Sequence, residues 1–115
     1  MEIEVGMYVR TKWGYICEII NINEFREPSM KYGVEANYLR DVMFIGEEDI
    51  LKASDNIIEL IEVGDYVNGY KVDFVQNNEI VYNHNHPRQL NMFAKDIKSI
   101  VTKEQFERCM YKVGE

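Results

Sequence analysis

Short apolar runs dominate the pattern of hydrophobic and polar positions in this chain. Each run is rich in β-branched or aromatic residues and is bounded by Gly, Asn, Asp or Pro, which is the signature of a β-strand. The pattern predicts strands at residues 8–9, 16–22, 38–45, 72–75 and 79–82. Between the last two runs, Asn77 and Asn78 predict a tight hairpin, because Asn tolerates a positive φ angle. A mainly β fold follows.

Helical periodicity is confined to two short segments. Thr102 and Gln105 have the spacing of a capping box, in which each side chain bonds a free backbone N–H of the first helical turn. Apolar residues then follow at positions i, i+3 and i+4, namely Phe106, Cys109 and Met110. We therefore expect a short helix near residues 103–109, and a single helical or 3₁₀ turn at the equivalent earlier place, residues 54–58.

An internal repeat organises the chain. Residues 3–9 and 61–67 are identical at six of seven positions and stand 58 residues apart. The match continues into a Gly-Tyr pair in each copy. We therefore predict two units of similar design, residues 1–60 and 61–115.

Each unit has the plan of a small closed β-barrel of the Src-homology-3-like kind, so we expect two such barrels in tandem. Closure suits a short chain because it leaves few strand edges exposed. A unit of this size buries a limited core, so we expect the two barrels to pack on each other, with residues 60–63 as a shared strand. The first unit carries a long loop at residues 23–37, and the second ends in the short helix near 103–109.

Composition and charge narrow the classes of function. The 115 residues are 46% hydrophobic and 29% charged, as in folded domains. With 13 Lys and Arg against 20 Asp and Glu, the net charge is −7. Nucleic acids and acidic membranes are held by an excess of cations, so we expect neither as a partner. The sequence has no basic leader and no apolar run of about 20 residues, so we expect a soluble, cytoplasmic protein.

Two segments carry a resemblance to known proteins. Residues 54–69 and 97–107 resemble recurrent segments of short, uncharacterised proteins encoded by phages and prophages of low-GC Gram-positive bacteria. The resemblance covers mainly residues 54–115. It implies a mobile-element origin and a host protein as the partner, because small phage accessory proteins often bind host proteins. It implies no catalytic chemistry, and the loop at 23–37 departs from it.

That loop has the composition of a recognition surface, since aromatic residues, Met and Arg are enriched at interfaces. The only tryptophan lies in the turn after the first strand, and a rigid aromatic anchor is a common interface hot spot. We expect five residues to contact a partner: Trp13, Phe25, Arg26, Met30 and Tyr32. The alternatives are a hairpin tip without a partner and a tryptophan that caps the core.

Three carboxylates gather at Glu47, Glu48 and Asp49, in a unit with 6 Lys and Arg against 12 Asp and Glu. Such an acidic surface could mimic a polyanion and inhibit a host nucleic-acid enzyme or a defence nuclease. A solvated turn that only maintains solubility predicts the same composition. The spacing lacks the alternating ligands of a calcium loop, so we expect no cation there.

Candidate catalytic and metal-binding chemistry is sparse. His84 and His86 could bind a transition metal together with Asp41 or Asp73, but we prefer a polar loop and expect no metal and no cofactor. No phosphate loop, nucleophile elbow or Cys/His quartet occurs in the sequence. We therefore predict a non-enzymatic accessory protein that acts by protein–protein recognition. An acidic inhibitor and a structural component of the virion are the alternatives, and the oligomeric state stays open.

Overall fold

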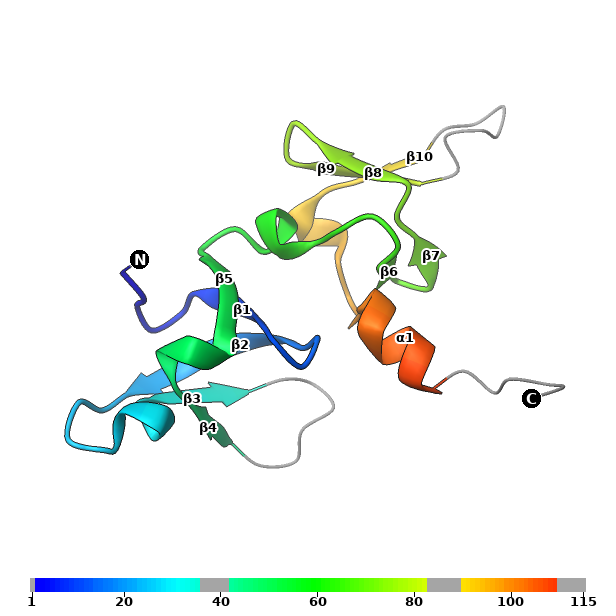
Figure 1. Cartoon of the computed structure of the whole chain (residues 1–115). Coiled ribbons are helices and arrows are strands. Elements are labelled where there is room, and N and C mark those ends of the chain that lie inside the picture. The colour runs from blue at the N-terminus through cyan, green and yellow to red at the C-terminus, as the bar shows by residue number, and fades with distance from the viewer. Residues whose placement is uncertain (1, 36–41, 83–89, 110–115) are drawn as a thin grey trace, which may run out of the picture. The chain divides into compact units, whose positions relative to one another are not determined.

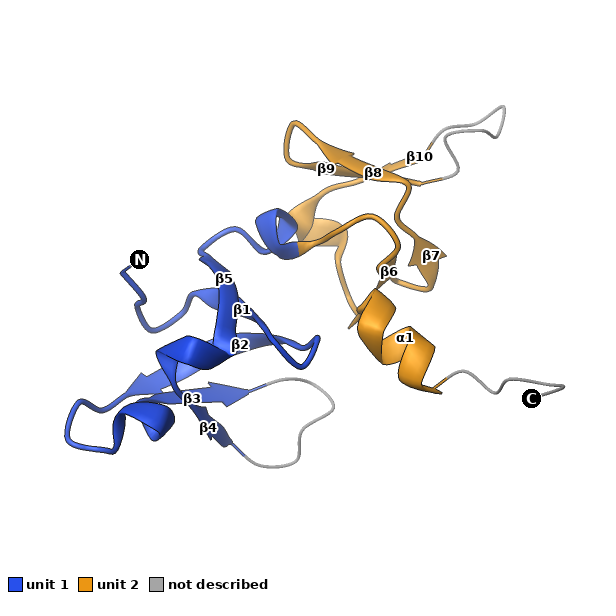
Figure 2. Ribbon diagram, in the orientation of Figure 1, with its two compact units in different colours: residues 1–60 blue, residues 61–115 orange. Residues whose placement is uncertain are grey.

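The computed structural model describes residues 2–35, 42–82 and 90–109 (Figure 1). These residues form mainly short antiparallel strands, with four 3₁₀ turns and one helix near the C-terminus. The expectation of a mainly β chain is confirmed. The chain divides into two compact units, residues 1–60 and 61–115 (Figure 2).

Unit 1 is built on one five-stranded antiparallel sheet with the strand order β4-β3-β2-β1-β5. Its strands are β1 (Tyr8–Thr11), β2 (Ile16–Ile22), β3 (Tyr32–Glu35), β4 (Met43–Ile45) and β5 (Ile50–Ser54). Its 3₁₀ turns are η1 (Pro28–Met30), η2 (Glu47–Asp49) and η3 (Ile57–Leu60). Strands β1 to β4 pair in chain order, and β5 returns to the free side of β1.

The core of unit 1 lies on one face of this sheet. The buried apolar residues that pack together there are Ile3, Val9, Cys17, Ile19, Tyr32, Val34, Ile45 and Ile50. The register sets Val9 between Cys17 of β2 and Ala53 of β5, so alternate residues of neighbouring strands share the buried face. Each fully buried aliphatic side chain on this face contributes about 1.5–3 kcal/mol to the stability of unit 1.

Unit 2 contains two three-stranded antiparallel sheets, with the orders β11-β6-β7 and β10-β9-β8. Its strands are β6 (Tyr66–Val67), β7 (Tyr70–Lys71), β8 (Phe74–Gln76), β9 (Glu79–Tyr82), β10 (Leu90–Met92) and β11 (Ile100–Val101). The turn η4 (Ala94–Asp96) precedes β11, and the helix α1 (Lys103–Cys109) follows it. Its most deeply buried apolar residues include Val67, Val72, Ile80 and Val81.

The two units repeat one backbone plan. Gly6 and Gly64 both adopt a left-handed φ, 96° and 97°, which glycine favours. Asp49 and Asp96 each end a 3₁₀ turn and accept a hydrogen bond from the backbone N–H three residues earlier, at 3.0 and 3.1 Å. Each turn is followed by the strand that pairs with the first strand of its unit, β5 with β1 and β11 with β6. In this order β3 corresponds to β9, and β4 to β10.

Two local predictions are confirmed. Asn77 and Asn78 have φ angles of 48° and 62° and join β8 to β9 as a tight hairpin. At the start of α1, the Gln105 side chain accepts the N–H of Thr102 at 3.0 Å, and the Thr102 hydroxyl accepts the N–H of Gln105 at 3.2 Å. Both features depend only on residues close in sequence.

Other expectations are corrected. The described strands form three open sheets and not closed barrels. Residues 60–63 are not a strand, because Leu60 ends η3 and the N–H of Asp65 bonds the carbonyl of Glu62 in a turn. The expected loop at 23–37 is interrupted by β3 from residue 32. Of the expected strand at 38–45, the structure shows β4, and residues 38–41 lie outside the described residues.

Candidate functional site

The connection between β2 and β3, residues 23–31, extends beyond the end of the unit 1 sheet (Figure 1). The Asn23 side chain accepts the N–H of Phe25 at 2.9 Å, which is an Asx turn. The N–H of Asn23 also bonds the carbonyl of Lys31 at 3.0 Å and closes the base of the connection. Pro28 then begins η1 with a fixed φ. Local hydrogen bonds and Pro28 thus restrict the backbone of the connection.

Two apolar side chains on this connection are left to solvent. Phe25 is 101% exposed, which is as much as in an extended chain, and Met30 is 43% exposed. A side chain so exposed contributes no burial to the stability of unit 1. Burying the Phe25 ring against another surface would contribute about 1.5–3 kcal/mol. The connection therefore exposes apolar surface that could be buried against a partner, on a backbone held by local hydrogen bonds.

Arg26, also on this connection, bends back over the outer face of the sheet. Its guanidinium carbon lies 4.4 Å from the centroid of the Phe44 ring, a cation–π contact, and its Nη2 donates to Asn21 Oδ1. Gly33 lies between Asn21 of β2 and Phe44 of β4 in the register. A β-carbon at Gly33 would stand 3.4 Å from the Phe44 ring, so the missing side chain lets this ring lie over β3.

The other two expected contact residues lie elsewhere. Tyr32 is 4% exposed and belongs to the core, so its ring anchors the end of the connection and is not a contact surface. Trp13 is partly exposed, with Lys12 Nζ 5.0 Å from its ring centroid. It lies in the turn between β1 and β2, at the opposite end of β2 from residues 23–31, so the structure does not bring the two together.

The acidic run divides into one structural carboxylate and two exposed ones. Asp49 is buried, with Lys12 Nζ 2.7 Å from its Oδ1 and the N–H of Gly46 donating to its Oδ2 at 3.0 Å. The bond from Lys12 above all, with that from Gly46, holds the pKa of Asp49 below its ordinary value. Asp49 is therefore not part of an acidic surface, whereas Glu47 and Glu48 are exposed.

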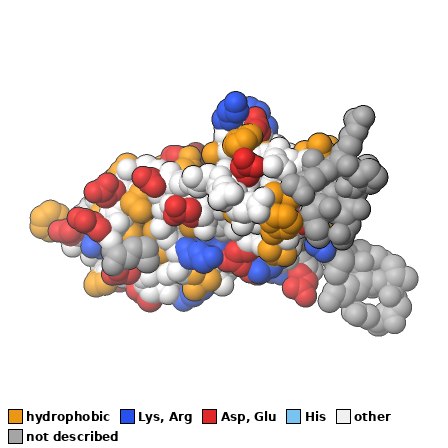
Figure 3. Space-filling view, turned by 90° about the horizontal axis from the view of Figure 1, so that it is seen from above, with side chains coloured by type: hydrophobic (Ala, Val, Ile, Leu, Met, Phe, Trp, Pro, Cys, Tyr) orange, Lys and Arg blue, Asp and Glu red, His pale blue; other side chains and the backbone are white. Residues whose placement is uncertain are grey.

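The turns η1 and η2 lie beside each other in unit 1. A β-carbon on Gly46 would stand 2.7 Å from the carbonyl oxygen of Pro28 and 2.7 Å from both carboxylate oxygens of Glu48. The approach of η1 to η2 therefore requires glycine at this position. Acidic side chains and protruding apolar ones accordingly gather at this end of unit 1 (Figure 3). The fold thus brings η1 and η2 together, although the two candidate surfaces lie apart in the sequence.

Sequence reasoning missed the residues of the outer face. Phe44 is 42% exposed and Val42 is similarly exposed, while Met43 and Ile45 between and after them face the core. Successive side chains of a strand point to opposite faces, so this alternation was readable in the run at 38–45. Without the register, nothing in the sequence set Phe44 under Arg26.

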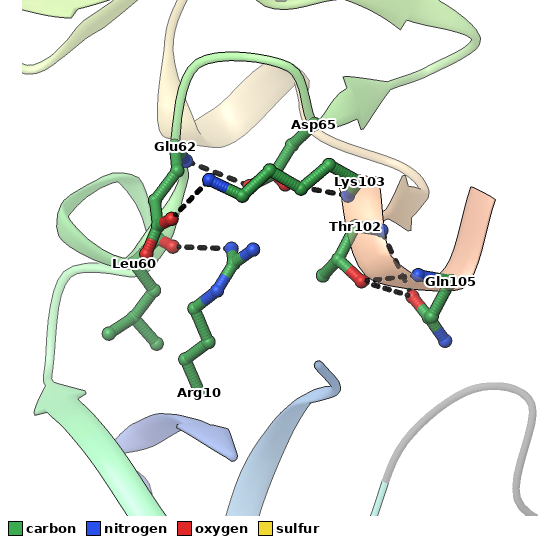
Figure 4. A network of polar contacts seen from close by, with 7 residues as sticks. All are labelled: Arg10, Leu60, Glu62, Asp65, Thr102, Lys103 and Gln105. Atoms are coloured by element: carbon green, nitrogen blue, oxygen red, sulfur yellow. Dashed lines mark hydrogen bonds and ion pairs between the residues drawn. The ribbon is translucent and has the colours of Figure 1, made fainter. Parts of the chain in front are cut away.

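A polar network in unit 2 supports the fold (Figure 4). Asp65 is 0% exposed, and its carboxylate accepts the N–H of Glu62 at 2.8 Å and the N–H of Lys103 at 2.9 Å. Lys103 Nζ lies 2.8 Å from Glu62 Oε1, and this bond raises the pKa of Lys103 above its ordinary value. The network attaches the start of α1 to the turn before β6, which is a structural role.

Unit 1 also buries a cation, Arg10, whose Nη1 donates to the carbonyl of Leu60 at 3.0 Å (Figure 4). His84 and His86, the pair considered for a metal, lie outside the described residues, as does Asp41. Among the residues that the structure describes, no group of three or more His, Cys, Asp or Glu is placed to hold a metal ion.

The fold and the site define a small antiparallel β protein with two units, the first of which has a connection at residues 23–31 that exposes Phe25. No family model, curated protein or solved structure matches this chain. Within the described residues, no helix is both long and apolar enough to cross a membrane.

Proposed function

We propose that this chain is a non-enzymatic accessory protein, of phage or prophage origin, that binds a partner protein through residues 23–31. The carrying observation is the Phe25 ring, which is 101% exposed on a backbone fixed by the Asn23 turn. Aromatic anchors of this kind dominate binding energy at protein interfaces. Because hydrogen bonds already hold the turn in the free protein, binding costs little backbone conformational entropy.

The comparison between the two units supports this proposal. The connection at 23–31 joins β2 to β3, and the corresponding connection of unit 2 joins β8 to β9 with Asn77 and Asn78 alone. The shared plan therefore does not need the longer connection. Residues that the fold does not need, and that expose a phenylalanine, are better explained by recognition.

We also propose that each unit is an open relative of the Src-homology-3-like barrel. The support is the common order of strands, followed by a 3₁₀ turn and a last strand that pairs with the first. The acidic-inhibitor alternative has less support, because Asp49 is committed to Lys12 and to the backbone of Gly46.

Site-specific photo-crosslinking tests the proposed function. Benzoylphenylalanine replaces Phe25 in one variant and Phe93, a partly exposed phenylalanine of unit 2, in a matched control. Both are irradiated in nuclease-treated lysate of a low-GC Gram-positive bacterium. We expect a discrete protein adduct from position 25 only, which excess wild-type protein removes and excess Phe25→Ala protein does not. Equal adducts from both positions, or competition by the Phe25→Ala variant, would contradict the proposal.

A further inference from the structure

We infer that residues 23–31 bind an apolar pocket bordered by Lys and Arg side chains on the partner protein. This inference rests on the proposed function and specifies the chemistry of the partner's surface. It concerns the acid-rimmed tip, defined as the apolar side chains of Phe25 and Met30 together with four exposed carboxylates of the connection and of the adjacent turn η2. Those carboxylates belong to Glu24, Glu27, Glu47 and Glu48.

The four carboxylates come from two elements that the fold sets side by side. Glu24 and Glu27 flank Phe25 in the chain, and both residues are exposed. Glu47 and Glu48 belong to η2, which lies against η1 at the position of Gly46. Two of the carboxylates thus lie on the connection that carries Phe25, and the other two lie on the turn beside η1, which carries Met30.

The two cations of this region, Arg26 and Lys31, already have partners within unit 1. Arg26 stacks its guanidinium on Phe44 and bonds Asn21 on the outer face. Lys31 Nζ lies 5.3 Å from the centroid of the buried Tyr32 ring and 3.9 Å from Glu24 Oε1. Two cations thus stand against four carboxylates, so these six residues carry a formal net charge of −2.

An apolar anchor within an acidic rim discriminates between partner surfaces by their charge. Interfaces place apolar contacts at the centre and polar groups at the rim, and complementary rims favour both orientation and encounter. A basic rim would satisfy the carboxylates, whereas an acidic rim would repel them. The same repulsion acts against nucleic acid, against an anionic membrane and against a second copy presenting the same tip. The apolar side chains favour an apolar pocket on the partner protein, and the carboxylates favour Lys and Arg side chains at the border of that pocket.

The test uses three fluorescent amphipathic peptides with identical leucine positions and with Lys, Gln or Glu at every polar position. Binding to the full chain is measured by anisotropy at about 20 mM salt, where charges are weakly screened, and at about 150 mM salt, where they are more strongly screened. We expect the Lys peptide to bind best, the Glu peptide not to bind, and higher salt to weaken the Lys complex. Phe25→Ala should weaken the Lys complex about 10-fold or more, from the lost ring burial.

A charge-reversal pair separates the tip from the net charge of −7. Glu47→Lys/Glu48→Lys should weaken the Lys complex about 10-fold or more, as expected for close charge pairs. Glu4→Lys/Glu107→Lys changes the net charge equally at exposed residues that belong neither to residues 23–31 nor to η2, and should change affinity less than about 3-fold. Circular dichroism checks that each variant is folded.

Each other result decides against the inference in a distinguishable way. Equal binding of the Gln and Lys peptides, with full dependence on Phe25, would overturn the basic border and leave the proposed function standing. Equal loss from both charge-reversal pairs would show attraction to net charge and overturn the inference. Binding that ignores Phe25 would overturn the proposed function as well, and absence of binding by all three peptides would overturn the inference.

Discussion

Replacing Asp65 by Asn should detach the start of α1 and destabilise unit 2. The buried carboxylate uses one oxygen for the N–H of Glu62 and the other for the N–H of Lys103. An Asn side chain has a single acceptor oxygen, and it turns an NH₂ group toward the second donor. One backbone N–H therefore loses its partner, which costs about 1.5–3 kcal/mol for a bond to a charged acceptor. Loss of charge weakens the bond that stays, so we expect a total of about 2–4 kcal/mol.

The repeat offers a second, more selective variant. Met7 occupies the position of Asp65 in unit 1, and its sulfur lies 3.2 Å from the backbone N of Glu4. The corresponding N–H in unit 2 is that of Glu62, 2.8 Å from the Asp65 carboxylate. Asp65→Met should therefore partly keep the turn and lose the bond to Lys103. Helix α1 should open while the turn before β6 stays formed.

Urea unfolding and amide hydrogen exchange measure these effects. We expect the Lys103 amide to lose protection from exchange in both variants. In Asp65→Met the Glu62 amide should keep part of its protection, because the Met sulfur can still accept its N–H. Asp55→Asn is the matched control, because Asp55 is an exposed residue of unit 1. If Asp65→Asn changed the free energy of unfolding by less than about 0.5 kcal/mol, as surface substitutions do, the assigned role of the carboxylate would be refuted.

Two further predictions concern η2. Because the pKa of Asp49 is lowered in the folded protein, the contribution of its bond to Lys12 is complete above the ordinary value of 3.8 and is lost as the pH falls through the lowered value. Urea unfolding at a series of acidic pH values should show this loss in the wild type, and a flatter profile in Lys12→Met; identical profiles would contradict it. Gly46→Ala should lower stability by about 1–3 kcal/mol, because the new methyl group meets the Pro28 carbonyl and the Glu48 carboxylate at 2.7 Å; an unchanged melting temperature would contradict it.

Features that depend on neighbouring residues were predictable from the sequence. The left-handed Asn77 and Asn78 need only their own tolerance of positive φ, and the Thr102 and Gln105 box needs only a three-residue spacing. β3 and β5 were missed for the opposite reason. Gly33 interrupts the first run, and β5 contains Lys and Ser, so both strands exist because of their partners in the sheet.

The candidate site shows the same division. Composition singled out residues 23–37, but it could not separate Phe25 from Tyr32, because one side chain is solvated and the other faces the core. Asp49 likewise looks like its two acidic neighbours in the sequence. Its different role comes from Lys12, which the pairing of β1 with β5 brings within 2.7 Å. Residue composition contains no information about such long-range strand pairings.

The differences between the two units carry the functional argument further than either unit does alone. Positions shared by both copies, such as Gly6 and Gly64, set the backbone plan. Where the copies differ, the change has an identifiable consequence, since Asp65 in place of Met7 adds a bond to the first residue of α1. Residues 23–31 are the largest such difference that the structure describes, and local bonds hold them without burying Phe25. Phe25 is not buried and therefore adds no burial to the stability of unit 1, so this departure from the repeat supports the proposed role in binding a partner.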